Sequence, residues 1–303
     1  MTEKTQSTQD IKDPIYLLGF TPLSCYLAAK FAQSGENPII LMPKEFYEGD
    51  KLEITLREEH SLKKQKENVR VAHLTEQKAQ MLIITSPLSN LKSELMFLSP
   101  SHLTTAPVVI FTPIYDTKIV ETLLKHNTIT ANFDGYLSIK ENTVNIHGAE
   151  PQITLSKPFN TLEFSLKALS LFHGANILSQ TSEDKNQIFW QKYALFALGS
   201  VFSAKYHQNL FTICKNKERA EEIKGAVSEL TSLAEKDGVH LNPEEIFNKL
   251  RETPMNFMYE TQISSNFSRK ELNYIYTVLA NIIYKQNIPC PILRKLLNKD
   301  ISA

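Results

Sequence analysis

Glycine and cysteine are both scarce in this sequence. Nine of its 303 residues are glycine, about 3%, whereas about 7% is usual. The three cysteines, Cys25, Cys214 and Cys290, lie far apart, are odd in number and form no CxxC pair. This excludes a disulfide framework and is typical of a reducing compartment. We expect three buried thiols in a cytoplasmic protein.

An excess of charge of one sign is also missing. The 33 lysines and arginines balance the 33 aspartates and glutamates, so the chain lacks the basic surplus that a phosphate backbone requires. No apolar run reaches the ~18 residues of a membrane span, and the polar residues 1–13 indicate a disordered tail rather than a signal peptide. The eight histidines show no metal-ligand spacing such as HxxxH. We expect no nucleic-acid partner, no membrane segment and no metal.

The first half of the chain alternates short apolar runs with helical patterns. Residues 15–18 are apolar, Gly19 interrupts them, residues 23–32 have helical spacing, and residues 38–42 are apolar again. Apolar runs joined by a helix are typical of parallel strands covered on both faces. Further strands are indicated at residues 81–85, 108–111 and 135–147, the last as a hairpin. We predict a Rossmann-like α/β domain with a mostly parallel, doubly wound sheet over residues 14–181.

After about residue 160 the pattern changes to amphipathic helices. They are indicated at residues 184–202, 218–237, 268–286 and 291–298. Asn242 and Pro243 predict the start of another helix, as its N-cap and its first residue. Ser268 and Glu271 have the spacing of a capping box. We predict an all-α domain over residues 182–303, with a ligand cleft between the two domains.

The turn after the first predicted strand is where a dinucleotide-binding sheet carries its G-x-G-x-x-G signature. Here the turn reads GFTPLS, so only Gly19 is glycine, and Thr21 and Ser24 stand at the other two positions. Ser24 is small enough for close helix packing. The Thr21 side chain crowds a pyrophosphate, however, and Pro22 has no amide donor. Two interpretations stay open: an altered pyrophosphate site, or a helix capped by Thr21 with no dinucleotide.

Lys44 follows the second predicted strand. A cation there suits the ribose 2′-phosphate of NADPH, whereas an acidic residue favours the unphosphorylated ribose. Glu45 beside it weakens this contrast. The alternative is an ordinary solvated lysine.

Several segments, taken in order, resemble those of one enzyme family. They are FWQKYALFALGSVFSA at 189–204, the stretch 220–243, MNFMYE at 255–260, KELNYI at 270–275, NIPCP at 287–291 and the hairpin at 136–147. Their order and spacing are similar to those of the ketopantoate reductase (2-dehydropantoate 2-reductase) family, of which the chain would be a divergent member over about residues 14–298. The resemblance implies a Rossmann domain followed by a helical domain, and NADPH-dependent reduction of a small 2-keto acid, as in pantothenate biosynthesis.

The resemblance also implies roles for single residues. Lys192 matches the general acid that protonates the substrate oxygen as hydride arrives, and Glu271 matches the glutamate that orients substrate and lysine. The other implied positions are Ser200 and Asn256 for the substrate, and Gly19, Thr21, Ser24 and Lys44 for NADPH. A homodimer is expected from the family.

At several positions the chain departs from the family pattern. Phe196 stands where the lysine helix normally has an asparagine. Ser86 and Pro87 replace a lysine after the strand at 81–85, and Thr112 with Pro113 replaces an asparagine after the next strand. Neither proline has an amide to donate to a cofactor.

These departures keep other functions open. One alternative is a catalytically silent protein with a reductase fold that binds another ligand or a protein partner. In that case Lys192 is an exposed helix lysine and Glu271 is only a capping residue. Another is a reductase with a larger or less polar substrate, because Phe196 makes the pocket more apolar.

Overall fold

The computed structural model describes residues 12–59, 64–112, 120, 121, 124, 128–157, 162–255, 257 and 266–299. Most of the predicted tail therefore lies outside the described residues. Among those described, no helix has the length and apolar character needed to cross a membrane.

A parallel sheet forms the centre of the first half. Strand β1 (Ile15–Leu18) pairs in parallel with β2 (Pro38–Leu41) and β5 (Met81–Ile84), and β5 pairs with β6 (Val108–Ile110). Every residue of these four strands is buried, since helices and further strands cover both faces. The predicted α/β fold with a mostly parallel sheet is confirmed.

Strands that the sequence did not reveal extend this sheet. The charged stretch after residue 50 forms an antiparallel pair, β3 (Lys51–Glu58) and β4 (Lys64–Ala72), and β4 joins β2. The predicted hairpin is longer than expected and comprises β7 (Ile129–Lys140) and β8 (Thr143–Ser156). After α4 (Leu162–Gly174), the strand β9 (Leu178–Ser182) pairs with β8.

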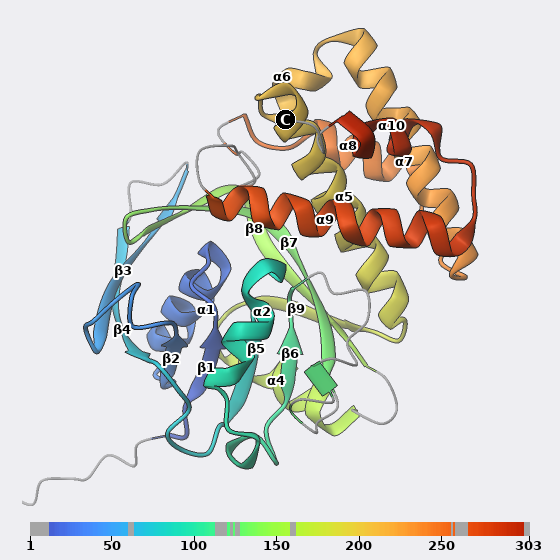
Figure 1. Ribbon diagram of the computed structural model, residues 1–303. Coiled ribbons are helices and arrows are strands. Elements are labelled where there is room, and N and C mark those ends of the chain that lie inside the picture. Colours follow the sequence, from blue (N-terminus) through green and yellow to red (C-terminus); the bar gives the residue numbers. More distant parts are fainter. Residues whose placement is uncertain are drawn as a thin grey trace, which may run out of the picture.

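The sheet closes around its first helix. The strand order is β3-β4-β2-β1-β5-β6-β7-β8-β9, and β3 also pairs with β8. Helix α1 (Pro22–Gln33) lies inside the curve, with β3 and β4 on one side and β7 and β8 on the other (Figure 1). This explains why α1 is buried nearly all round and has a weak amphipathic pattern. The opposite face is covered by α2 (Leu88–Glu94) and two short 3-10 turns, Leu95–Phe97 and Pro100–His102.

The second half is helical, as predicted. Its helices are α5 (Lys185–Tyr206), α6 (Leu210–Cys214), α7 (Lys217–Lys236), α8 (Pro243–Arg251), α9 (Asn266–Gln286) and α10 (Pro291–Lys299). Asn242 caps α8 and Pro243 is its first residue, which confirms that prediction. Trp190, with 1% of its surface exposed, lies in a core shared by these helices.

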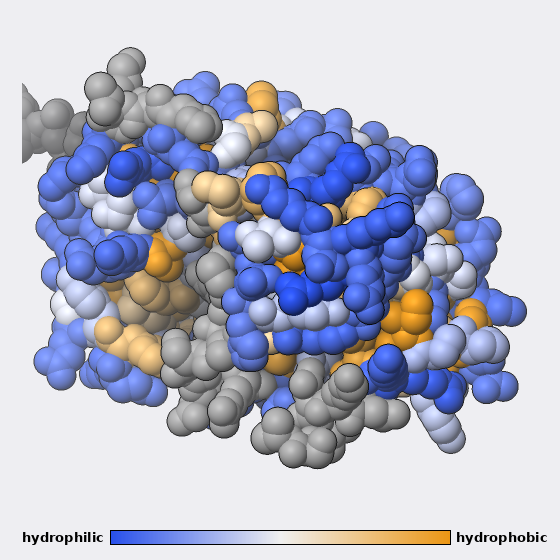
Figure 2. All heavy atoms as spheres, turned by 90° about the horizontal axis from the view of Figure 1, so that it is seen from above, coloured by the Kyte–Doolittle hydropathy of each residue, from blue (hydrophilic) through white to orange (hydrophobic). Residues whose placement is uncertain are grey.

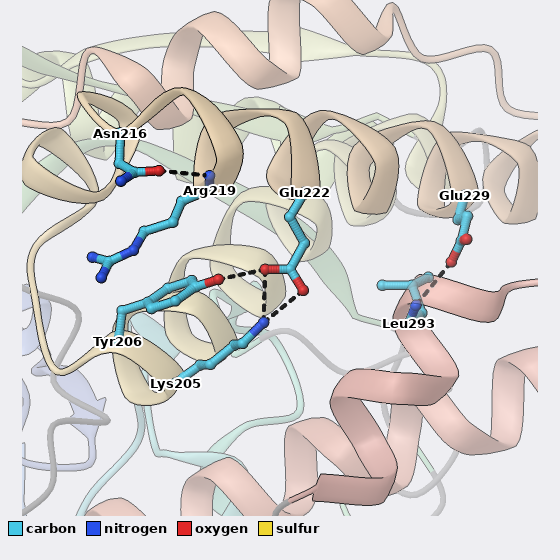
Figure 3. A network of polar contacts seen from close by, with 7 residues as sticks. All are labelled: Lys205, Tyr206, Asn216, Arg219, Glu222, Glu229 and Leu293. Atoms are coloured by element: carbon cyan, nitrogen blue, oxygen red, sulfur yellow. Dashed lines mark hydrogen bonds and ion pairs between the residues drawn. The ribbon is translucent and has the colours of Figure 1, made fainter.

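Two glutamates of α7 tie the helices together (Figure 3). The Glu222 carboxylate accepts hydrogen bonds from the Lys205 ammonium and the Tyr206 hydroxyl at the end of α5. The Glu229 carboxylate accepts from the backbone amides of Ile292 and Leu293, at 2.9 and 2.8 Å. These are amides of the first turn of α10, which have no partner within their own helix. Glu229 therefore caps α10 from another helix.

Two expectations were wrong in detail. Helix α9 begins at Asn266, so Ser268 is not its N-cap, and Glu271 lies in the second turn rather than at the third position. The capping-box prediction at Ser268 failed because α9 already begins two residues earlier. Cys25 and Cys290 are buried, but Cys214 is only half-buried, on the short helix α6; all three are free thiols.

Candidate functional site

The candidate site lies at the carboxyl edge of the parallel strands. Helix α9 crosses this edge and packs against α2 (Figure 1). Seen from above (Figure 2), the surface is mostly hydrophilic, and its left side is hollowed with apolar side chains on the floor. The loops after β1, β5 and β6 all end at this edge, where ligands of open α/β sheets usually bind.

Gly19 follows β1 and is required there for two reasons. Its φ of +96° lies in the region that favours glycine. A Cβ at Gly19 would also lie 2.7 Å from the Cα of Ser86, in the loop after β5. The backbone amide of Gly19 donates to the Leu41 carbonyl at the end of β2, at 3.2 Å. Gly19 thus lets three strand ends meet closely.

Thr21 caps α1, as expected from the interpretation in which its side chain caps the helix. The Thr21 Oγ1 accepts from the Ser24 amide at 3.1 Å, and the Ser24 Oγ accepts from the Thr21 amide at 2.8 Å, forming a reciprocal capping box. The Thr21 hydroxyl donates to the Thr85 hydroxyl at 3.1 Å, which in turn donates to the Leu18 carbonyl at 3.0 Å. The donors at the start of α1 are therefore largely used within the protein.

Further hydroxyls link the neighbouring strand ends. The Ser86 hydroxyl donates to the Leu18 carbonyl at 3.2 Å, and the Thr112 hydroxyl donates to the Ser86 carbonyl at 2.6 Å. The hydroxyl cluster, as we call it, comprises Thr21, Ser24, Thr85, Ser86 and Thr112. It fastens the loops after β1, β5 and β6 to one another. Sequence reasoning noted Ser86 and Thr112 only as replacements and missed this network, which joins residues far apart in the chain.

A pyrophosphate could use the Ser24 amide only if the Thr21 side chain moved away from it. Pro22 offers no amide, and the Thr21 side chain occupies the Ser24 amide that a phosphate would use. A side-chain cap contributes about 1 kcal/mol, whereas micromolar binding of a ligand provides about 8 kcal/mol. Displacing the cap would therefore cost little compared with the free energy that micromolar binding of a ligand provides. Lys44 is exposed just beyond the end of β2.

Lys192 points from α5 to the edge beside β6. Its ammonium donates to the Ala131 carbonyl of β7 at 3.3 Å and lies 5.9 Å from the centre of the Phe111 ring, directly after β6. Burial lowers the pKa of Lys192 to about 7, because few water molecules are left to solvate its charge. No carboxylate forms an ion pair with it in the part of the chain that the structure describes. Lys192 is therefore not an exposed helix lysine.

Glu271 points from α9 to the start of α2. Its Oε2 accepts from the backbone amide of Ser89 at 3.0 Å, and the residue is 7% exposed. Helix α2 has no side-chain cap of its own, since Pro87 stands at its N-cap. Glu271 supplies the missing acceptor from 182 residues away. The proline at the N-cap was the available sequence signal that an outside acceptor was needed.

The remaining predicted positions lie elsewhere or are not described. Ser200 is fully buried within α5, two turns beyond Lys192, and Asn256 lies outside the described residues. Phe196 is partly buried and packs against the helical core. The structure thus brings Lys192 and Glu271 to adjacent strand ends, those of β6 and β5, and does not show a substrate position for the other two.

Known proteins share this fold at low sequence identity. No protein-family model and no curated protein matches the sequence. A D-mandelate dehydrogenase solved with NADH and anilino(oxo)acetate is 12% identical, with 94% of this chain and 96% of that chain covered and a TM-score of 0.78. A 2-dehydropantoate 2-reductase from Geobacter metallireducens is 12% identical, covering 94% and 98%, with a TM-score of 0.75. A dimeric ketopantoate reductase from Staphylococcus aureus is 14% identical, covering 94% and 96%, with a TM-score of 0.72.

The predicted resemblance is confirmed at the level of the fold. The chain has the fold of the ketopantoate reductases and of D-mandelate dehydrogenase over nearly its whole length. These neighbours are oxidoreductases, so the chain has a reductase fold. Its own chemistry depends on the residues at the edge of the sheet.

Proposed function

We propose that this protein is an NADP(H)-dependent oxidoreductase that reduces a small 2-keto acid, with Lys192 as the general acid. The observation that carries the proposal is the environment of Lys192, which is half-buried at the carboxyl end of β6 with its pKa lowered to about 7. A proton donor works best when its pKa lies near the working pH. Burial of a lysine without a carboxylate partner costs folding free energy, which a purely structural role does not explain.

Lys192 has the donors that this role requires. A protonated ammonium has three N–H groups, and the Ala131 carbonyl takes one of them. Two are left to hold the substrate carbonyl oxygen and to transfer a proton as negative charge develops on it. The Phe111 ring beside the ammonium keeps this region apolar, which strengthens the interaction. The bound cofactor supplies the hydride.

We assign Glu271 a positioning role. Its contact with the Ser89 amide fixes the start of α2, and thereby the loop after β5 that packs against Gly19. For the cofactor, Gly19, Thr21 and Ser24 would hold the pyrophosphate at the start of α1, after Thr21 turns away. The exposed Lys44 beyond β2 would contact a 2′-phosphate, which favours NADPH over NADH.

A second candidate is a reductase-fold protein without catalysis that binds another ligand or a protein partner. It is favoured by the capping box of Thr21 and Ser24, which already uses the donors of the turn. Pro22 and Pro87, at the starts of α1 and α2, remove two more.

Calorimetric titration with NADPH, and separately with NADH, decides between the candidates. We expect NADPH to bind in the micromolar range and more tightly than NADH, followed by turnover of 2-keto acids, ketopantoate being the first tested. Lys192→Ala should abolish turnover and leave cofactor binding intact. Absence of binding to either cofactor at millimolar concentration would favour the second candidate, and turnover by Lys192→Ala would contradict the role of Lys192.

We also propose a homodimer in the cytoplasm. The dimer is supported by the neighbour from Staphylococcus aureus, which is described as dimeric, and the compartment by three free thiols. Sedimentation at micromolar concentration and microscopy of a fluorescent fusion test the two statements.

A further inference from the structure

A cavity lies away from the edge described above, where the sheet closes around α1. Its volume is about 320 Å³, which is within the range of small-molecule sites. It is bounded by α1, by β3 and by β8, and so it opens at the seam where β3 pairs with β8. Leu56 and Ile146 give it an apolar wall. None of the residues proposed for reduction lines it.

The lining is strongly acidic. Glu58, Glu59, Glu150 and Lys30 are the charged residues that line it, and their formal charges sum to −2. Glu59 lies 3.5 Å from the ring of His147, whereas no ion pair forms between Lys30 and a carboxylate among the described residues. In that part of the chain no three histidine, cysteine or carboxylate side chains converge as a metal ion requires.

Tyr26 provides the second feature of the cavity. It lies on α1 with 2% of its surface exposed, lines the cavity, and packs its ring edge-on against Phe133 at 5.9 Å. Its hydroxyl makes no hydrogen bond to another described residue, and it is not among the fully enclosed polar atoms that lack a partner. Burial and the charges of Glu150 and Glu58 raise the pKa of Tyr26, so the hydroxyl stays neutral and can accept or donate.

We propose that this cavity binds a small organic cation that carries a primary ammonium group on a short aliphatic chain. The ammonium has three donors, which suit the Tyr26 oxygen and the carboxylates of Glu58 and Glu150. The aliphatic chain packs against Leu56 and Ile146. This site is independent of the proposed reductase activity.

Titration of the whole protein with butylamine tests the proposal, with ligand-observed NMR to detect binding and calorimetry to measure it. We expect saturable binding with a Kd of about 1 mM or tighter. Tyr26→Phe keeps the buried ring, and Glu150→Gln changes an exposed side chain, so both variants should fold. Each should weaken binding about tenfold, since each removes a hydrogen bond to a charged group.

The controls distinguish binding in this cavity from nonspecific attraction of a cation to surface carboxylates. Glu53→Gln, which changes a glutamate of β3 outside the cavity, should leave binding unchanged. Butan-1-ol and butyrate, which have the same chain without the positive charge, should not bind. The proposal is overturned if butylamine shows no saturable binding, if Tyr26→Phe and Glu150→Gln bind it as the parent protein does, or if butan-1-ol binds equally well.

Discussion

The carboxylate of Glu271 in α9 accepts a hydrogen bond from the backbone amide of Ser89 in α2, at 3.0 Å. This contact fastens the helical half of the chain to the edge of the parallel sheet. Within the helical half, Glu229 of α7 accepts from two amides of α10. In both cases a glutamate of one helix accepts hydrogen bonds from first-turn amides of another helix.

Replacement of Glu271 by alanine should destabilise the protein by about 1–2 kcal/mol, because the Ser89 amide then loses its acceptor in a buried place. Glu271→Gln keeps an amide oxygen in the same place and should cost less. Urea unfolding of the two variants measures this difference. Equal stability of Glu271→Ala and the parent protein would show that the contact contributes nothing.

The environment of Lys192 predicts a dependence on pH in two measurements. Its pKa is about 7 in the folded protein, against an ordinary value of 10.5. Reduction by the proposed mechanism should slow as the pH rises through about 7, because the proton donor is lost. Stability should change in the opposite direction, since between these two values the unfolded chain binds more protons than the folded one.

Lys192→Met isolates the effect on stability, because it keeps the chain length and removes the charge. The free energy of unfolding of the parent protein, relative to Lys192→Met, should rise between pH 7 and pH 10. Below pH 7 the relative value should be flat and lowest, since the charge is then buried in the folded protein. Unfolding in urea at several pH values measures both. Parallel curves for the two proteins would contradict the lowered pKa.

Local signals in the sequence were sufficient for much of the fold. The cap at Thr21 and the start of α8 at Asn242 follow from side chains within three residues of the helix they cap. The apolar runs of β1 and β5 gave the parallel sheet, because strands covered on both faces have no polar alternation.

The features that were missed depend on distant contacts. Strands β3 and β4 are rich in charge, and β3 pairs with β8 only because the sheet closes. The environment of Lys192 comes from Ala131 and Phe111, about 60 and 80 residues earlier. The partner of Glu271 lies in the other half of the chain, so the capping box suggested by Ser268 was a false local signal.

Alanine substitutions at Gly19 and Gly35 can separate the cost of a positive φ from the cost of a steric clash. Gly19→Ala should destabilise the protein by about 2–3 kcal/mol or more, because its φ is +96° and its Cβ would lie 2.7 Å from the Cα of Ser86. Gly35→Ala is the matched control: its φ is +74°, but nothing lies within 4 Å of the new Cβ. We expect it to cost about 1 kcal/mol. Thermal unfolding measures both, and equal losses would mean that the loop after β5 moves aside without cost.

Thr21 determines how well the turn accepts a pyrophosphate. Thr21→Gly restores the second glycine of the dinucleotide signature and releases the Ser24 amide, so NADPH should bind up to about tenfold more tightly. The loss of the cap should cost only a few tenths of a kcal/mol, because glycine is itself tolerated as an N-cap. Thr21→Ser keeps the capping hydroxyl and should bind NADPH as the parent protein does. Calorimetry measures all three affinities. If Thr21→Gly binds NADPH no better than Thr21→Ser, the capping box is not the obstacle, and the missing amide of Pro22 is the next cause to test.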